Sequence, residues 1–277
     1  MLLLKQSKYR YCGSILAVAS VQSGDLKPIP NCDNRRFHDK EVAWMQRHNP
    51  GRSFTSIWRV LTLLIVLAVG PTLALAQEGG HVLPGKAHPH GYSLTDMLIA
   101  SAVFNSGGSN PTNPNTPIPN TPFQILFADL SDTTFSSLPC GGVTAHGHGF
   151  YTPFMVKAGT PFYVPLIGAD DSPPVLGTFP TTDRTALDYF FNADQLGGQN
   201  WVITVDGRST AVGPEFLAGP VTTQPLPDGG GTHAIWLAVF LTPLSVGDHT
   251  IHFSGQLEGV LACFGEDFTY KVKVVPY

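Results

Sequence analysis

Two histidines near the middle of the chain are the residues best suited to chemistry. The segment AHGHG, residues 145–149, carries His146 and His148 one residue apart, with glycine beside each. In an extended segment, side chains two residues apart point to the same face, so the two imidazoles would form a pair of metal ligands. Glycine at this density equally suits a turn. The segment is therefore interpreted either as half of a metal site or, as we favour, as a glycine-rich turn.

A metal site at these histidines needs ligands from elsewhere in the chain. The glutamate that follows the H-x-H pair in cupin metal sites is absent, because Gly149 is followed by FYTP. Other histidines and carboxylates supply the candidates for completing the site: His88, His90, His233, Glu266 and Asp267. Imidazoles with a carboxylate suit Zn²⁺ or Cu²⁺. We expect no cofactor, with Zn or Cu as the alternative.

A pair of cysteines bears on which carboxylates approach the histidines. If the chain is exported, only Cys140 and Cys263 remain in the mature protein, and in an oxidising compartment a lone pair indicates one disulfide. Two free buried thiols are the alternative. A Cys140–Cys263 bond would bring the segment with Glu266 and Asp267 to the end of the domain that holds His146 and His148. These four residues form the predicted metal site.

Export is predicted from the segment around residues 45–76. Arginines precede a compact apolar run, VLTLLIVLAV, and Gly70-Pro71 and the small-residue sequence ALA lead to Gln77. This order is typical of a secretory signal peptide, cleaved after Ala76. The alternative is that this segment stays uncleaved and anchors the chain in a membrane. We expect no other contact with a membrane. The predicted location is secreted, periplasmic or in the cell envelope.

The signal peptide divides the chain into four parts. Residues 1–44 precede Met45 and are interpreted as a spurious extension of the gene start, with a genuine cytoplasmic leader as the alternative. Residues 45–76 are the signal peptide, residues 77–121 an N-terminal helix with a linker, and residues 122–277 a β-sandwich domain. Residues 1–76 hold 10 Lys+Arg and 4 Asp+Glu (+6), whereas residues 77–277 hold 6 and 16 (−10). The negative charge of residues 77–277 argues against nucleic acid as a partner.

The mature chain is predicted to be mainly β. Short aromatic and β-branched runs alternate with turn residues from position 122 onward, at 123–130, 149–156, 161–167, 201–207, 233–241, 249–255 and 267–275. Their number and spacing favour an antiparallel β-sandwich, Ig-like or jelly-roll-like. AIWLAVFL, apolar throughout, is typical of a central strand covered on both faces.

One or two short helices complete the predicted fold. Ser93 and Asp96 suit a helix cap before the apolar periodicity of LTDMLIASAVF, which Gly107-Gly108 ends. Residues 182–198 suit a second helix ending at Gly197. Residues 105–122 are rich in proline and asparagine, so we expect an extended linker or covering loop.

The C-terminal half resembles a family of secreted, mostly bacterial β-rich proteins. The similarity rests on VKAGTPFYVPLIGADDSPP (156–174), VDG (205–207) and PLSVGDHTIHFSG followed by FTYKVKVVP (243–276). In that family a strand, a DG turn, a PL-x-x-G-x-HTI-x-F-x-G hairpin and a final TY-x-x-x-V strand occur in this order. The resemblance implies export and a β fold, and it implies no substrate. The tryptophan-rich N-terminal segment of the family is absent here.

Other motifs do not indicate an enzyme. The chain has no G-x-S-x-G, H-E-x-x-H, Walker A or G-x-G-x-x-G sequence. GADDSPP (168–174) would suit a Ca²⁺ ligand pair or an acid and base, but its residues are also those of a turn. LPDGGGTH (226–233) precedes a strand and is interpreted as a hairpin connection.

Three functions are ranked from these patterns. We expect an exported, non-catalytic β-sandwich that binds an unknown small ligand, polymer or protein, with Trp201, Tyr163 and Trp236 as candidate contacts unless they pack in the core. The alternative is a metal-binding protein or metal-dependent extracellular enzyme using the HGH pair. A structural envelope protein comes third.

Overall fold

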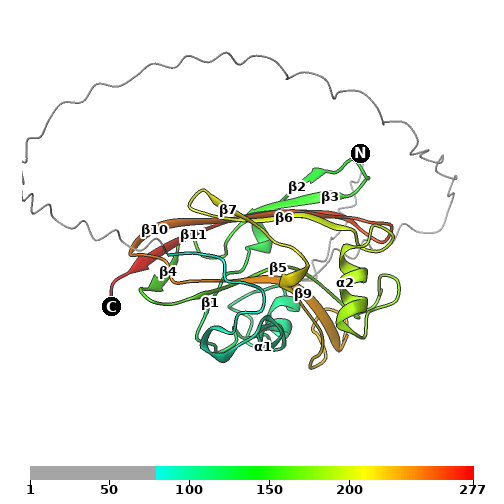
Figure 1. Ribbon diagram of the computed structural model, residues 1–277, viewed down its shortest axis with the longest axis horizontal. Coiled ribbons are helices and arrows are strands. Elements are labelled where there is room, and N and C mark those ends of the chain that lie inside the picture. Colours follow the sequence, from blue (N-terminus) through cyan, green and yellow to red (C-terminus); the bar gives the residue numbers. More distant parts are fainter. Residues whose placement is uncertain (1–78) are drawn as a thin grey trace, which may run out of the picture. The chain divides into compact units, whose positions relative to one another are not determined.

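The computed structural model describes residues 79–277, which form two packed β-sheets with two helices (Figure 1). The expected leader, signal peptide and cleavage point lie outside the described residues. Helix α1 (Leu94–Ser106) lies against the smaller sheet, and helix α2 (Asp183–Phe191) lies at one end, where it contacts strands of both sheets. Within residues 79–277, no helix is long and apolar enough to cross a membrane.

The strands form one large and one small sheet. The large sheet has the order β2 (Thr134–Ser137), β3 (Val143–His148), β11 (Cys263–Val275), β10 (Gly247–Glu258), β6 (Gly198–Val205) and β7 (Arg208–Ala211), and β4 (Phe154–Lys157) also pairs with β11. The small sheet has the order β1 (Gln124–Ile125), β5 (Phe162–Asp170), β9 (His233–Leu241) and β8 (Leu217–Thr222). Three short 3-10 helices complete the elements of the described part of the chain: η1 (Pro89–Gly91), η2 (Leu130–Asp132) and η3 (Pro214–Phe216).

The prediction of a mainly β sandwich is confirmed, although the sheets are mixed. Six strand pairs are antiparallel, but β1–β5, β3–β11 and β4–β11 are parallel. Both parallel pairings of the large sheet involve β11. They place β3 and β4 one after the other along the same side of β11, and this arrangement builds the site described below.

The core lies between the two sheets and follows the side-chain alternation of the strands. In β11, Phe268, Tyr270, Val272 and Val274 are buried, whereas Lys271 and Lys273 are exposed. The ring of Phe268 stacks on that of Phe253 in β10, with 5.7 Å between centroids. Strand β9 is apolar and buried from Ala234 to Leu241 because α1 covers the face that the large sheet does not.

Helix α1 joins the N-terminal segment to the same core. Ser93 Oγ accepts from the Asp96 N–H, and the Asp96 carboxylate accepts from the Ser93 N–H, so the expected capping box is present. The helix packs on β8 and β9, and the Leu83 N–H donates to the Phe240 carbonyl. Thr116 of the proline- and asparagine-rich segment is buried. Residues 105–122 thus form a covering loop.

Several expected boundaries are wrong. The strand expected at 123–130 is reduced to β1, the strand expected at 149–156 begins only at Phe154, and the second helix ends at Phe191 rather than at Gly197. Strands β2, β3, β7 and β8 were not expected at all. These four strands are short and mostly polar or rich in small residues, so pairing with neighbouring strands rather than apolar alternation determines them.

The disulfide Cys140–Cys263 is present. It joins the β2–β3 turn to the start of β11, with 6.0 Å between the Cα atoms and 123 residues of sequence separation. Gly142 lies so close to this junction that a Cβ atom would be 1.7 Å from the Cys263 carbonyl oxygen. The glycine therefore permits β3 to start directly beside β11.

Candidate functional site

The AHGHG segment lies in strand β3 and the residue after it, not in a glycine-rich turn, which corrects our favoured interpretation. A Cβ on Gly147 would lie 2.6 Å from the ring of Phe268, and a Cβ on Gly149 would lie 2.6 Å from the ring of Phe154. These glycines make room for core aromatic rings. His146 and His148 project from the opposite, outer face of the large sheet, as strand alternation requires.

His146 belongs to a cluster of four polar side chains on this outer face. Its Nε2 lies 2.7 Å from Ser136 Oγ in β2, and its Nδ1 lies 3.5 Å from Asp267 Oδ2 in β11. The other oxygen of Asp267 lies 2.8 Å from Nε2 of His252 in β10. We call Ser136, His146, Asp267 and His252 the histidine cluster. Each residue comes from a different neighbouring strand.

The backbone register explains why these residues meet. His146 is the parallel partner of Asp267, and it is paired with Thr134 of β2, two residues before Ser136. His252 pairs with Thr269, two residues after Asp267. Residues one step apart along neighbouring strands on one face are within reach of long side chains. The side chains of His146, Asp267 and His252 remain partly exposed.

His148 makes separate contacts. Its Nδ1 lies 3.0 Å from the Gly149 carbonyl oxygen, and its Nε2 lies 3.0 Å from Asp132 Oδ2. The Gly149 carbonyl, and then the Asp132 carboxylate, raise the pKa of His148 because both accept hydrogen bonds from the charged ring. Both ring nitrogens of His148 are thus engaged by oxygen atoms of the protein.

The predicted approach of Glu266 and Asp267 to the histidines holds only for Asp267. Glu266 is opposite Ala145 and Gly255 on the inner face of β11, whereas Asp267 lies on the outer face. The ring of Trp201 covers Gly255, where a Cβ would be 2.2 Å from it. Burial in this apolar space raises the pKa of Glu266 to about 8.

The remaining candidate ligands lie elsewhere. His233 Nδ1 is 2.7 Å from Asp171 Oδ2. His88 directly precedes η1, and His90 belongs to it. The His90 ring packs edge-on against Phe123. Within residues 79–277, no group of three or more histidine, cysteine, aspartate or glutamate side chains is arranged to hold a metal ion.

We expect the purified protein to bind no stoichiometric Zn²⁺ or Cu²⁺. The ring nitrogens of His146 and His148 already face hydrogen-bond partners, so a metal ion would have to displace them. Elemental analysis after dialysis against each metal measures the occupancy. One ion per chain that disappears in a His146→Ala/His148→Ala variant would contradict this expectation.

Two loops that were interpreted separately lie together at one end of the small sheet. Asp171 Oδ1 accepts from the N–H groups of Thr232 and His233, at 2.6 and 2.8 Å, and Ser172 Oγ donates to Asp228 Oδ1 at 3.0 Å. Burial, followed by the negative charge of Asp228, raises the pKa of Asp170 to about 6. The Asp171 carboxylate thus joins the loop GADDSPP to the loop LPDGGGTH through hydrogen bonds. This agrees with the interpretation of the first loop as a turn and of the second as a hairpin connection.

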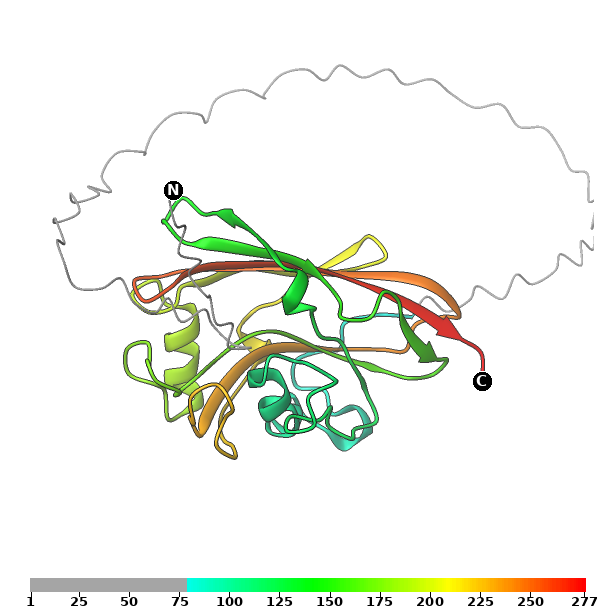
Figure 2. The ribbon, with the colours of Figure 1, turned by 180° about the vertical axis from the view of Figure 1, so that it is seen from behind.

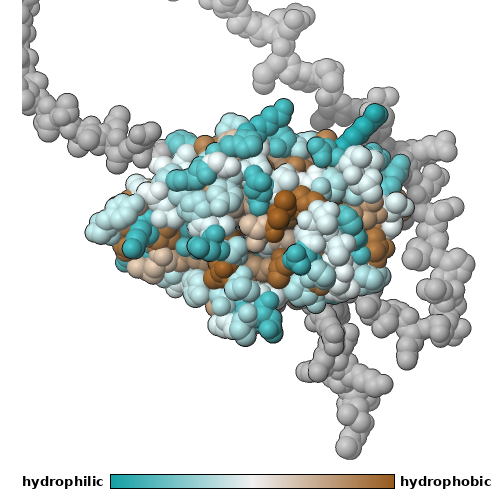
Figure 3. Space-filling model, turned by 90° about the horizontal axis from the view of Figure 1, so that it is seen from below, coloured by the Kyte–Doolittle hydropathy of each residue, from teal (hydrophilic) through white to brown (hydrophobic). Residues whose placement is uncertain are grey.

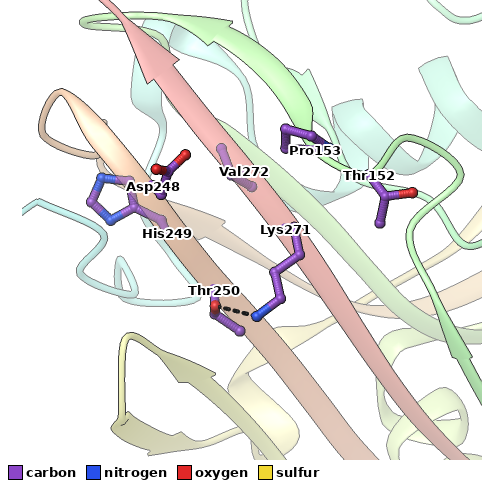
Figure 4. A pocket seen from close by; sticks show the side chains of 7 residues that line it. All are labelled: Thr152, Pro153, Asp248, His249, Thr250, Lys271 and Val272. Carbon is purple, nitrogen blue, oxygen red and sulfur yellow. Dashed lines mark hydrogen bonds between the residues drawn. The ribbon is translucent and has the colours of Figure 1, made fainter.

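A pocket of about 310 Å³ opens beside Lys271 (Figure 4). Lys271 lies on the same outer face of β11 as Asp267 of the histidine cluster, because the two are an even number of residues apart. It is lined by Thr152, Pro153, Asp248, His249, Thr250, Lys271 and Val272. Lys271 Nζ donates to Thr250 Oγ1 at 2.9 Å, so the ammonium group and the Asp248 carboxylate both border the pocket. The sequence indicated only that Lys271 faces solvent. It held no signal for a pocket, because Thr152 and Pro153 come from a distant loop.

The aromatic residues considered as ligand contacts are core residues instead. Trp201 is 2%, Tyr163 0% and Trp236 4% exposed. Trp201 lies between the sheets, and Trp236 packs over Gly168 in the neighbouring strand. A ligand on the described surface cannot stack on them.

No protein-family model matches the chain, and no curated protein matches it significantly in sequence.

Proposed function

We propose that this chain is an exported binding protein whose ligand, a polar polymer, lies along the outer face of the large sheet. The observation that carries the proposal is that, within residues 79–277, no helix or strand layer covers this face (Figures 1 and 2). The small sheet, by contrast, is covered by α1 and the 105–122 loop. Figure 3 shows that opposite side of the molecule, where small apolar areas lie among polar ones.

The chemistry of the face supports a polar, extended ligand. Lys271 in the pocket and Asp267 in the histidine cluster lie four residues apart on β11, which is about 13 Å along a strand. Between them lie Thr269 of β11 and His252 of β10. With Trp201 and Trp236 buried, recognition would rest on hydrogen bonds and charges rather than on aromatic stacking. A polymer reaches both groups at once, whereas a small ligand does not.

Export rests on separate support. The predicted signal peptide leads into a chain whose two remaining cysteines form a disulfide, and disulfides persist in oxidising compartments.

Co-sedimentation with insoluble polymers tests the proposal. The probes are cellulose, chitin and calcium alginate, which are neutral, amide-bearing and anionic. We expect retention on at least one, weakened at least tenfold by Lys271→Ala/His252→Ala. Lys86→Ala/His88→Ala, which removes the same charge types from the exposed segment before η1, should bind as the unmodified protein does. Equal weakening by both pairs, or retention on none of the probes, would contradict the proposal.

A further inference from the structure

The histidine cluster contains an arrangement that binding alone does not require. A serine hydroxyl lies against one nitrogen of an imidazole, and a carboxylate lies beside the other: Ser136 Oγ is 2.7 Å from His146 Nε2, and Asp267 Oδ2 is 3.5 Å from His146 Nδ1. Nucleophilic serine hydrolases use this connectivity on unrelated folds. We propose that Ser136 is a nucleophile activated by His146, and that the outer face hydrolyses carboxylic esters.

The surrounding contacts suit the roles of the three groups. With Nδ1–H directed toward Asp267, the imidazole presents an unprotonated Nε2 to Ser136 Oγ, which is the tautomer a general base needs. The 3.5 Å separation is an ion-pair distance, and such contacts tighten as positive charge develops on the ring. His252 holds the other oxygen of Asp267 at 2.8 Å and so fixes the carboxylate. Asp267 and His252 are thus positioning residues.

The edge strand also supplies a donor for the oxyanion. The Leu138 N–H donates to the Gly142 carbonyl, so the antiparallel alternation makes Ser136 and Thr144 a hydrogen-bonded pair and Ser137 and Val143 a non-hydrogen-bonded pair. The N–H of Ser137 therefore points to the open side of β2, the edge strand of the large sheet. It directly follows the nucleophile, so it is placed to donate to the oxygen of a tetrahedral intermediate.

The reaction needs only an ester and water. Ser136 Oγ attacks the carbonyl carbon while its proton passes to His146 Nε2, and the carbonyl π pair moves to oxygen. Collapse breaks the carbon–oxygen bond of the ester, and the imidazolium protonates the departing alkoxide. Water then attacks the acyl-serine, with His146 again taking and returning the proton, to release the acid and free Ser136. An open sheet face suits short, unhindered acyl groups.

A fluorophosphonate tests the nucleophile directly, since it forms a stable phosphonyl ester with an activated serine and does not with an ordinary one. The purified protein is incubated with a biotinylated fluorophosphonate, the modified residue is located by peptide mass spectrometry, and p-nitrophenyl acetate hydrolysis is followed in parallel. We expect modification of Ser136. Ser136→Ala should abolish it, and His146→Ala should slow it at least tenfold at an unchanged melting temperature.

Two further variants separate activation from simple accessibility. Ser254 lies on the same face of β10, so Ser254→Ala should leave labelling unchanged. Asp267→Asn keeps the shape of the side chain but removes its charge, so it should slow labelling and alter the pH dependence of the rate, which a purely structural role would not do. Labelling of no serine, labelling of Ser254 as fast as Ser136, or full labelling in His146→Ala would each overturn the proposal. The assay uses no polymer, so its failure leaves the binding proposal untouched.

Discussion

Replacing Cys140 and Cys263 together with serine is expected to lower the free energy of unfolding by about 4 kcal/mol. The bond closes a long loop, with 123 residues of sequence separation, and removing such a cross-link restores much conformational freedom to the unfolded chain. Urea unfolding of the oxidised protein, the reduced protein and the double variant measures the change. The reduced protein and the double variant should have the same free energy of unfolding, because both lack the disulfide bond. The reduced protein keeps the native cysteine side chains, so this agreement assigns the loss to the bond rather than to the serine replacements.

The loss should be uneven within the fold. Strand β3 is held by its parallel pairing with β11 and by the edge strand β2, and the disulfide joins the start of this arrangement. Amide hydrogens of Val143–Ala145 should therefore exchange faster in the variant than those of β9, which lies in the middle of the small sheet. A stability change below about 1 kcal/mol, or equal acceleration in β3 and β9, would show that the bond does not organise this edge.

Patterns within single segments made much of the fold predictable. The alternation from Phe268 to Val274 gives the two faces of β11, the apolar run of β9 matches its bounds of His233–Leu241, and the Ser93–Asp96 capping box starts α1. Each of these depends on neighbours within a few residues, where propensity and periodicity act. The two cysteines were predictable as a pair because no other partner remained after the expected signal peptide.

The candidate site was less predictable because it depends on pairing between distant strands. Gly147 and Gly149 of the AHGHG segment resemble turn residues until their aromatic neighbours are placed beside them. Phe268 follows Gly147 by more than a hundred residues, and Phe154 follows Gly149 by five. Ser136 lies in a short exposed strand without alternation, so no local pattern singles it out. Choosing between Glu266 and Asp267 required the register of β11 against β3, since a shift of one residue exchanges the two faces.

Glu266→Gln is expected to stabilise the protein at pH 8 while having little effect near pH 4. Glu266 lies on the inner face of β11 beside Ala145 and Gly255. Burial raises its pKa from 4.5 to about 8. Between these values the folded protein holds a proton that the unfolded chain has released. The free energy of unfolding should therefore fall as pH rises through this window, and level off above it.

Partial exposure of the residue limits the size of the effect, so we expect a gain of about 2 kcal/mol at pH 8 for the glutamine variant, which cannot ionise. Urea unfolding at pH 4, 6 and 8 measures it. Glu258→Gln is the matched control, because that carboxylate lies on the same hairpin but accepts a surface hydrogen bond from Gln199 at 2.7 Å. It should leave the pH dependence of the wild type in place. If the free energy of unfolding of Glu266→Gln falls with pH as steeply as that of the wild type, the Glu266 carboxyl is not the group that causes this pH dependence.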